Sequence, residues 1–207
     1  MQKEVIINSE SDAWFQRNKD VLIGRKDFSY LNQVLKYINS GEKVLEIGSS
    51  FGYNLNFLVE KSGCHGYGLE PSGQAITFGE ELYPDLVFKQ GTIDSSDIFD
   101  TNFNHVIIGF CLYLVDVELL PEIVFRVNKI LEKGGYLHIF DFDSKYPVEK
   151  DYAHDSRIRT RKMDYASLFN AFPNYFTVEK KSWSHVEEKF HINPNERCST
   201  TTLFKEF

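Results

Sequence analysis

Two acidic residues and a loop of small residues stand at the ends of two apolar runs in the first third of the chain. Glu46 lies in the first run, the loop at residues 48–52 follows it, and Glu70 ends the second run, 24 residues after Glu46. Glycines at 48 and 52 let a ligand approach the backbone closely. Glu46 can attract an ammonium group, directly or through water, while backbone N–H groups at a helix N-terminus bind a carboxylate. Since Glu70 can accept two hydrogen bonds from a ribose diol, the pattern predicts a nucleoside ligand with an amino-acid end.

The same loop disfavours a ligand that carries a diphosphate. A dinucleotide-binding fingerprint, G-x-G-x-x-G, would need glycines at 48, 50 and 53, but Ser50 and Tyr53 stand at the last two positions. A P-loop is excluded because no G-K-[ST] follows. The predicted ligand therefore lacks a pyrophosphate.

Alternating strand and helix patterns must position these residues. Apolar, strand-like runs occur at residues 43–48, 66–70, 86–88, 105–110 and 136–142. Strands separated by helices imply right-handed crossovers, so residues 28–143 predict a doubly wound parallel α/β sheet with helices on both faces. The runs 175–183 and 198–207 predict an antiparallel hairpin that completes a mostly parallel seven-stranded sheet. Residues 144–162 are polar and charge-rich, and we expect a loop there.

Length and charge bound the remaining possibilities. The chain has 207 residues, which favours one domain, residues 28–207, with an N-terminal cap segment at 1–27. Its net charge of −7 disfavours nucleic acid as a partner. The sequence lacks the run of roughly 18 apolar residues that a membrane-spanning helix needs, so we expect a soluble, cytoplasmic protein. Its oligomeric state is left open.

The two acidic motifs carry a resemblance to a known family. VLEIGSSFG at 44–52, followed by GYGLEPS at 66–72, resembles motif I and the acidic motif of class I S-adenosylmethionine (SAM)-dependent methyltransferases. FCLYLVD at 110–116, LEKGGYLHIFDF at 131–142 and the closing hairpin follow in the order of the family. One departure is Ser50, where the family usually has glycine. The resemblance implies a Rossmann-like methyltransferase fold and S-adenosyl-L-methionine as the cofactor.

The resemblance also implies which residues bind this cofactor. Gly48, Ser50 and Gly52 would line the methionine moiety with Glu46 nearby, and Glu70 would hold the ribose. Asp94 would lie near the adenine amino group with Thr92 and Ile93 alongside, and Phe110 and Cys111 would close the site beneath the sulfonium. For Asp94, a helix cap or a loop residue is the alternative.

A general base is needed only if the acceptor loses a proton on attack. Methyl transfer is an in-line displacement that depends chiefly on alignment, but a hydroxyl acceptor requires a base. The candidates are His154, Tyr113 and Asp141, with His154 preferred because the ordinary pKa of histidine lies nearest neutrality. A solvent-exposed histidine is the alternative for His154. Asp141 and Asp143 share a face but lack a third ligand, so no metal is predicted.

The acceptor is suggested by a narrower resemblance. WFQRN at 14–18, FCLYLVD and the segment 154–165 resemble small bacterial methyltransferases of capsule, lipopolysaccharide or flagellar sugar pathways. This implies that Trp14 and Arg17 touch a ligand, with an aromatic contact that fixes the N-terminal segment to the core as the alternative for Trp14. It also implies that the substrate is a small molecule or a glycan precursor methylated on oxygen, at a sugar hydroxyl or a capsule phosphoramidate group. Arg159 and Lys162, in a basic run, could bind an anionic acceptor, with a solvated loop as the alternative.

Two other classes of function share the predicted sheet. An NAD-dependent oxidoreductase or epimerase also uses an acidic residue for the ribose, and a non-catalytic partner subunit could retain a cofactor-binding fold. Methylation of nucleobases loses support because no [DNS]-P-P-[YFW] follows residues 105–110 and no Pro-Cys pair occurs. Methylation of a small molecule is the leading hypothesis.

Overall fold

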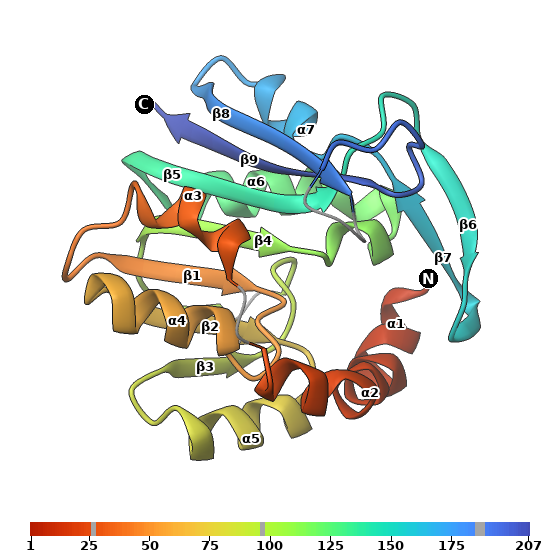
Figure 1. The fold of residues 1–207 in the computed structure, drawn as a ribbon, viewed down its shortest axis with the longest axis horizontal. Helices are drawn as coiled ribbons and strands as arrows, with labels where there is room; N and C mark the ends of the chain where they lie inside the picture. The colour runs from red at the N-terminus through yellow and green to blue at the C-terminus, as the bar shows by residue number, and fades with distance from the viewer. Residues whose placement is uncertain (26–27, 96–97, 185–188) are drawn as a thin grey trace.

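A seven-stranded sheet forms the centre of the computed structural model, which describes residues 1–25, 28–95, 98–184 and 189–207. The strands are β1 (Lys43–Ile47), β2 (His65–Glu70), β3 (Val87–Gln90), β4 (Phe103–Gly109), β5 (Leu131–Phe142), β8 (Tyr175–Ser184) and β9 (Arg197–Lys205). Their order is β3-β2-β1-β4-β5-β9-β8, and β1 to β5 run parallel while β9 pairs antiparallel with β5 and β8 (Figure 1). The predicted α/β fold, with its antiparallel C-terminal strand pair, is confirmed.

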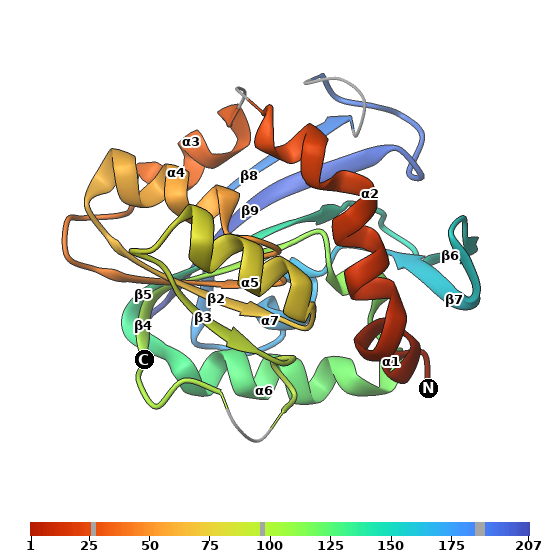
Figure 2. The same ribbon diagram turned by 90° about the horizontal axis from the view of Figure 1, so that it is seen from below.

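Helices cover both faces of this sheet (Figure 2). One face carries α3 (Asn32–Leu35), α4 (Tyr53–Ser62) and α5 (Gly73–Leu82), and the other carries α6 (Leu120–Ile130) and α7 (Ala166–Asn170). The unbroken apolar run of β4 fits this arrangement, because Val106, Ile107 and Ile108 are fully buried between the two helical layers. Among the described residues, no helix combines the length and the apolar character that crossing a membrane requires.

The N-terminal residues form a helix that lies beyond the carboxyl ends of the strands (Figure 1). It comprises α1 (Lys3–Val5), the π-helical η1 (Ile6–Glu10) and α2 (Ser11–Ile23), and we call residues 3–23 the N-terminal helix. Phe15 anchors it, since its buried ring contacts Phe51 and Phe78. The predicted boundary of the cap segment at residue 27 lies outside the described residues.

The prediction of a loop at 144–162 was wrong. This segment contains an antiparallel pair, β6 (Val148–Tyr152) and β7 (Asp155–Lys162), that stands apart from the main sheet. Ile158 and Thr160 are buried on one face of β7, whereas Arg157 and Arg159 are exposed on the other. The alternation was present in the sequence, but the dense charges of the segment concealed it.

Asp116 links the N-terminal helix to the sheet. Its carboxylate accepts hydrogen bonds from the backbone N–H groups of Gln2, at 3.2 Å, and Lys3, at 3.1 Å. The Gln2 side chain also donates to the carbonyl of Leu114 and accepts from the backbone N–H of Arg159. The start of the N-terminal helix is thereby fixed to the turn after β4 and to β7.

Candidate active site

A cavity of about 710 Å³ is lined by residues at the carboxyl ends of β1, β2 and β4 and by residues of the N-terminal helix. Small-molecule sites typically occupy roughly 300–1,000 Å³, so a nucleoside and a small acceptor fit together. Twelve of the residues singled out in the sequence line it: Trp14, Glu46, Gly48, Ser50, Glu70, Thr92, Ile93, Asp94, Phe110, Cys111, Tyr113 and His154. The structure does not place Gly52, Arg17, Asp141, Arg159 and Lys162 in this lining.

The loop after β1 owes its shape to left-handed backbone conformations. Gly48 has a φ of +74°, and a Cβ there would lie 3.1 Å from the Cβ of Cys111, which explains the need for glycine. Ser50 adopts the same region at +50°, where a side chain is strained, and its hydroxyl is buried without a partner. Gly52, at +81°, begins α4 and packs against Leu86, where a Cβ would come within 2.6 Å.

Glu46 is a buried carboxylate that the protein leaves half satisfied. Its Oε1 accepts a hydrogen bond of 2.7 Å from the Asn54 side chain, while its Oε2 has no partner in the described parts of the chain. Burial raises the pKa of Glu46 to about 8, although the Asn54 hydrogen bond opposes the shift. A cationic ligand group beside Oε2 would stabilise the ionised form.

Glu70 shapes the loop and still faces the cavity. Its Oε2 accepts from the backbone N–H of Ser50 and its Oε1 from that of Ser72, both at 2.8 Å. Burial raises the pKa of Glu70 to about 7 against the lowering effect of these two hydrogen bonds. Each carboxylate oxygen keeps a second acceptor position for a ligand hydroxyl.

Asp94 has a partner that the sequence did not reveal. The Lys3 ammonium, from α1, lies 2.5 Å from Oδ2 of Asp94. Burial alone would raise the pKa of Asp94, but the hydrogen bond and charge of Lys3 hold it below its ordinary value. Lys3 lines the same cavity, so the N-terminal helix reaches the end where Asp94, Thr92 and Ile93 lie.

The three predicted catalytic residues occupy different positions. Tyr113 lines the cavity, and burial raises its pKa so that the phenol is neutral. His154 lines it from the exposed turn between β6 and β7. Asp141 instead accepts hydrogen bonds from the backbone N–H groups of Leu112, at 3.1 Å, and Phe142, at 2.7 Å, and so supports the turn after β4.

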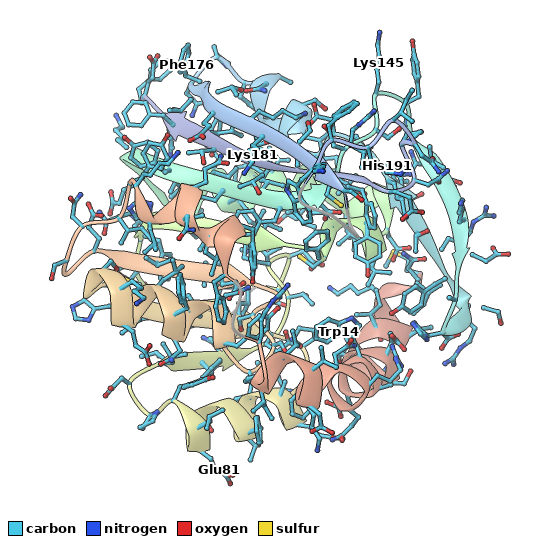
Figure 3. The ribbon with its side chains drawn as sticks, viewed as in Figure 1. Trp14, Glu81, Lys145, Phe176, Lys181 and His191 are labelled. Carbon is cyan, nitrogen blue, oxygen red and sulfur yellow. The ribbon has the colours of Figure 1, made fainter. Side chains whose placement is uncertain are left out.

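Of the predicted acceptor-binding residues, Trp14 lines the cavity, and Arg17, Arg159 and Lys162 do not. Trp14 lies on the side of α2 that faces the strand ends (Figure 3). Arg17 forms an ion pair with Glu10. Arg159 is exposed on the outer face of β7, and the Lys162 ammonium lies over the ring of Phe142 and donates to the carbonyl of Asn195. A basic anion-binding run inside the cavity is therefore not formed.

Sequence reasoning missed several residues that line the cavity. Asn54 had a readable signal, because it is a buried polar residue on the apolar side of α4. Glu10, Tyr152 and Trp183 had none, since they come from segments distant in the sequence. In the described parts of the chain, no three His, Cys, Asp or Glu side chains gather as a metal site would require.

Comparisons with known proteins agree with this geometry. The methyltransferase domain family matches residues 18–183. The phosphoethanolamine N-methyltransferase of Plasmodium falciparum (isolate 3D7) is 23% identical over 176 residues, which cover 77% of this chain and 66% of that protein.

Solved structures share the fold at low sequence identity. A TehB-like SAM-dependent methyltransferase from Corynebacterium glutamicum superposes with a TM-score of 0.69 at 13% identity, covering 96% of this chain and 99% of that one. The 1,6-didemethyltoxoflavin-N1-methyltransferase of Burkholderia thailandensis was solved with bound 1,6-didemethyltoxoflavin and S-adenosylhomocysteine. It superposes with a TM-score of 0.72 at 14% identity, and the match covers 100% of this chain and 90% of that one. The resemblance to class I SAM-dependent methyltransferases is thus confirmed, whereas none of these relatives is named for a surface-polysaccharide pathway. By its match and its fold, the chain belongs to the methyltransferase domain family.

Proposed function

We propose that this chain transfers a methyl group from S-adenosyl-L-methionine to a small molecule held beneath the N-terminal helix. The observation that carries the proposal is the pair of buried carboxylates, Glu46 and Glu70, on the cavity wall beside the left-handed loop. Glu46 Oε2 lacks a protein partner, and Glu70 has acceptor positions to spare. A zwitterionic nucleoside satisfies both groups, and a dinucleotide diphosphate does not.

The cavity offers a group for each part of this cofactor. Glu46 would bind the ammonium group, and Arg25, which lines the same cavity, the carboxylate. Glu70 would hold the ribose hydroxyls, and Asp94 the adenine amino group. When bound, the cofactor supplies a methyl group on a positively charged sulfur.

The chain mainly aligns the reactants and keeps competing nucleophiles away. Cys111 lies in the cavity wall, and burial raises the pKa of its thiol well above the ordinary value. Because the thiolate is the nucleophilic form, this cysteine does not take the methyl group itself. The apolar side chains of Phe110 and Phe142 exclude water from the same region.

The identity of the acceptor is less constrained. Methylation of a sugar hydroxyl on a surface-polysaccharide precursor was expected from the sequence, with Arg159 and Lys162 as anion-binding residues. That finer assignment draws no support from the cavity, because neither side chain lines it. Two of the reported relatives are named as N-methyltransferases, which favours a small nitrogen-containing acceptor.

A release assay for S-adenosylhomocysteine tests the proposal. The protein is mixed with S-adenosyl-L-methionine and a panel of small amines, sugars and phenols, and Glu70→Ala serves as the inactive control. Acceptor-dependent release by the natural chain, lost in Glu70→Ala, is the expected result. Failure of the natural chain to bind S-adenosylhomocysteine contradicts the proposal.

A further inference from the structure

We infer that Glu10 and Tyr152 form the acceptor subsite and that the acceptor is a small amine, bound there as its ammonium ion. The inference rests on the proposed methyl transfer and specifies its substrate class. Both residues line the cavity, Glu10 from the N-terminal helix and Tyr152 from β6. They meet although 142 positions separate them in the chain.

The charges of the cavity wall favour a cation. Its described lining contains five carboxylates, Glu10, Glu46, Glu70, Asp94 and Asp116, against two permanent cations, Lys3 and Arg25. Asp94 already pairs with Lys3, and Asp116 accepts hydrogen bonds from the backbone N–H groups of Gln2 and Lys3. Glu46 and Glu70 are assigned to the cofactor. Glu10 has an ion-pair partner, Arg17, but this arginine lies outside the cavity lining, so the Glu10 carboxylate lines the cavity without its partner cation beside it there. It is the carboxylate that we assign to the acceptor.

Two neighbouring side chains hold Glu10 in place. The side chain is only 5% exposed and forms an ion pair with Arg17, which does not itself line the cavity. The Tyr152 hydroxyl donates a hydrogen bond of 2.9 Å to Oε1 of Glu10. Burial raises the pKa of Tyr152 to about 12, so it stays a neutral phenol. Oε2 accepts one long hydrogen bond of 3.5 Å from the Arg17 guanidinium and keeps a further acceptor position.

A second buried polar group beside Glu10 is unsatisfied by the protein. Ser11 follows Glu10 in the chain and lines the same cavity. Its hydroxyl is buried and has no hydrogen-bond partner among the described residues. Buried polar groups are normally paired, so this oxygen marks a position where a ligand N–H group can donate. A protonated amine has enough donors for both Glu10 and Ser11.

Aromatic side chains complete the subsite. Trp14, Tyr113, Tyr152 and Trp183 all line the cavity, and the faces of such rings attract cations. The chain itself provides a precedent on this wall, because the Lys162 ammonium lies 3.7 Å from the centre of the Phe142 ring. Phe142 is also a lining residue.

The subsite accounts for every proton in the reaction. The bound ammonium gives one proton to Glu10, directly or through Tyr152, whose hydroxyl proton then moves to Glu10. The neutral amine nitrogen forms a bond to the methyl carbon as the carbon–sulfur bond breaks, and that electron pair stays on sulfur. The products are a methylated ammonium ion and neutral S-adenosylhomocysteine, and Glu10 returns its proton to solvent.

The test compares amines with alcohols of the same shape. Protein saturated with S-adenosylhomocysteine is titrated calorimetrically with benzylamine against benzyl alcohol and with ethanolamine against ethylene glycol. The natural chain should bind each amine at least about tenfold more tightly than its alcohol, as a charge-assisted hydrogen bond implies. Glu10→Gln keeps the shape of the side chain but should abolish this preference while leaving S-adenosylhomocysteine affinity unchanged. Glu4→Gln is the matched control, because Glu4 is exposed on the same helix and lies outside the cavity lining.

The outcomes separate this inference from the proposed function. Failure of the natural chain to bind S-adenosylhomocysteine overturns the proposed function. Binding of S-adenosylhomocysteine without a preference for amines, or a preference that survives Glu10→Gln, overturns the amine subsite. If Glu10→Gln does not fold, Ser11→Ala decides, since its hydroxyl has no protein partner to lose. An undiminished amine affinity in that variant contradicts the inference.

Discussion

The two sides of the cavity are built in contrasting ways. Glu46, the loop at 48–52 and Glu70 form the side that we propose binds the cofactor, here called the cofactor side. It is held by contacts between residues close in sequence, such as the Ser50 N–H to Glu70 and Asn54 to Glu46. The cover, formed by residues 2–23 with β6 and β7, is held by contacts across most of the chain. Lys3 reaches Asp94, and Gln2 binds the backbone of Arg159.

This difference assigns the two sides different tasks. The backbone of a β-α-β unit fixes the cofactor side, which can be preorganised without any other part of the molecule. Side-chain contacts between distant segments fix the cover, so its chemistry can vary without changing the sheet. We expect substitutions on the cofactor side to change cofactor affinity and substitutions in the cover to change acceptor selection.

The largest effect, on the affinity for S-adenosylhomocysteine, is expected for Glu70→Ala. The variant loses the ribose partners and frees the backbone N–H groups of Ser50 and Ser72, and each hydrogen bond to a charged group contributes about 1.5–3 kcal/mol. Calorimetry should show S-adenosylhomocysteine binding weakened by at least about tenfold. The control is Glu81→Ala, an exposed residue on α5 (Figure 3). Equal affinity in Glu70→Ala and Glu81→Ala would contradict the assignment of the cofactor side.

The second prediction concerns pH. Burial raises the pKa of Glu46 to about 8 and of Glu70 to about 7, from an ordinary value of 4.5. The folded state therefore holds more protons than the unfolded state between these values. The contribution of these two protonated carboxyl groups to the free energy of unfolding is complete below pH 4.5, and it is lost as the pH rises through 7 to 8.

Urea unfolding at several pH values measures this loss. The free energy of unfolding of the ligand-free chain should fall by about 5 kcal/mol between about pH 5.5 and about pH 8.5, at about 1.4 kcal/mol per pKa unit for the two groups together. S-adenosylhomocysteine should reduce the fall, because its ammonium group stabilises ionised Glu46, and Glu46→Gln should leave only the part that Glu70 contributes. A stability that rises over this interval would show that these carboxylates are not strained by burial.

The third prediction concerns the cover. Asp116→Ala removes the acceptor for the backbone N–H groups of Gln2 and Lys3, a contact that resembles a helix cap and contributes about 1 kcal/mol. Limited proteolysis should cut within residues 1–25 faster than in the natural chain. Asp116→Asn retains one acceptor oxygen and should show a smaller effect. Unchanged cleavage in Asp116→Ala would mean that other contacts hold the cover.

The smallest effect, on the free energy of unfolding, is expected for substitutions of Ser50. Its φ of +50° strains any side chain, so Ser50→Gly should be more stable than Ser50→Ala by about 0.5–1 kcal/mol. Comparing the two variants removes the contribution of the buried hydroxyl. Urea unfolding measures the difference, and a more stable alanine variant would show that this backbone conformation carries no strain.

The sequence predicted the cofactor side better than the cover for the same structural reason. Glu46 and Glu70 lie on the two strands of one β-α-β unit, and the loop at 48–52 connects the first of these strands to the helix. The contact of Tyr152 with Glu10 joins segments that share no pattern. Asp116 illustrates the limit. It lies in the segment after β4, yet its carboxylate accepts hydrogen bonds from the backbone N–H groups of Gln2 and Lys3, at the start of the chain.

The β6–β7 pair shows a second limit. Burial of only Ile158 and Thr160 marks the inner face of β7, and this apolar signal is too short to compete with the surrounding arginines and aspartates. The predicted loop was wrong, and Arg159 and Lys162 of the basic run do not line the cavity. Arg161 instead pairs with Glu149 across the two strands.

Calorimetric titration of the natural chain with S-adenosylhomocysteine and, separately, with NAD distinguishes a methyltransferase site from a dinucleotide site. We expect saturable one-site binding of S-adenosylhomocysteine and no heat of binding with NAD. Saturable binding of NAD together with a silent S-adenosylhomocysteine titration would contradict it.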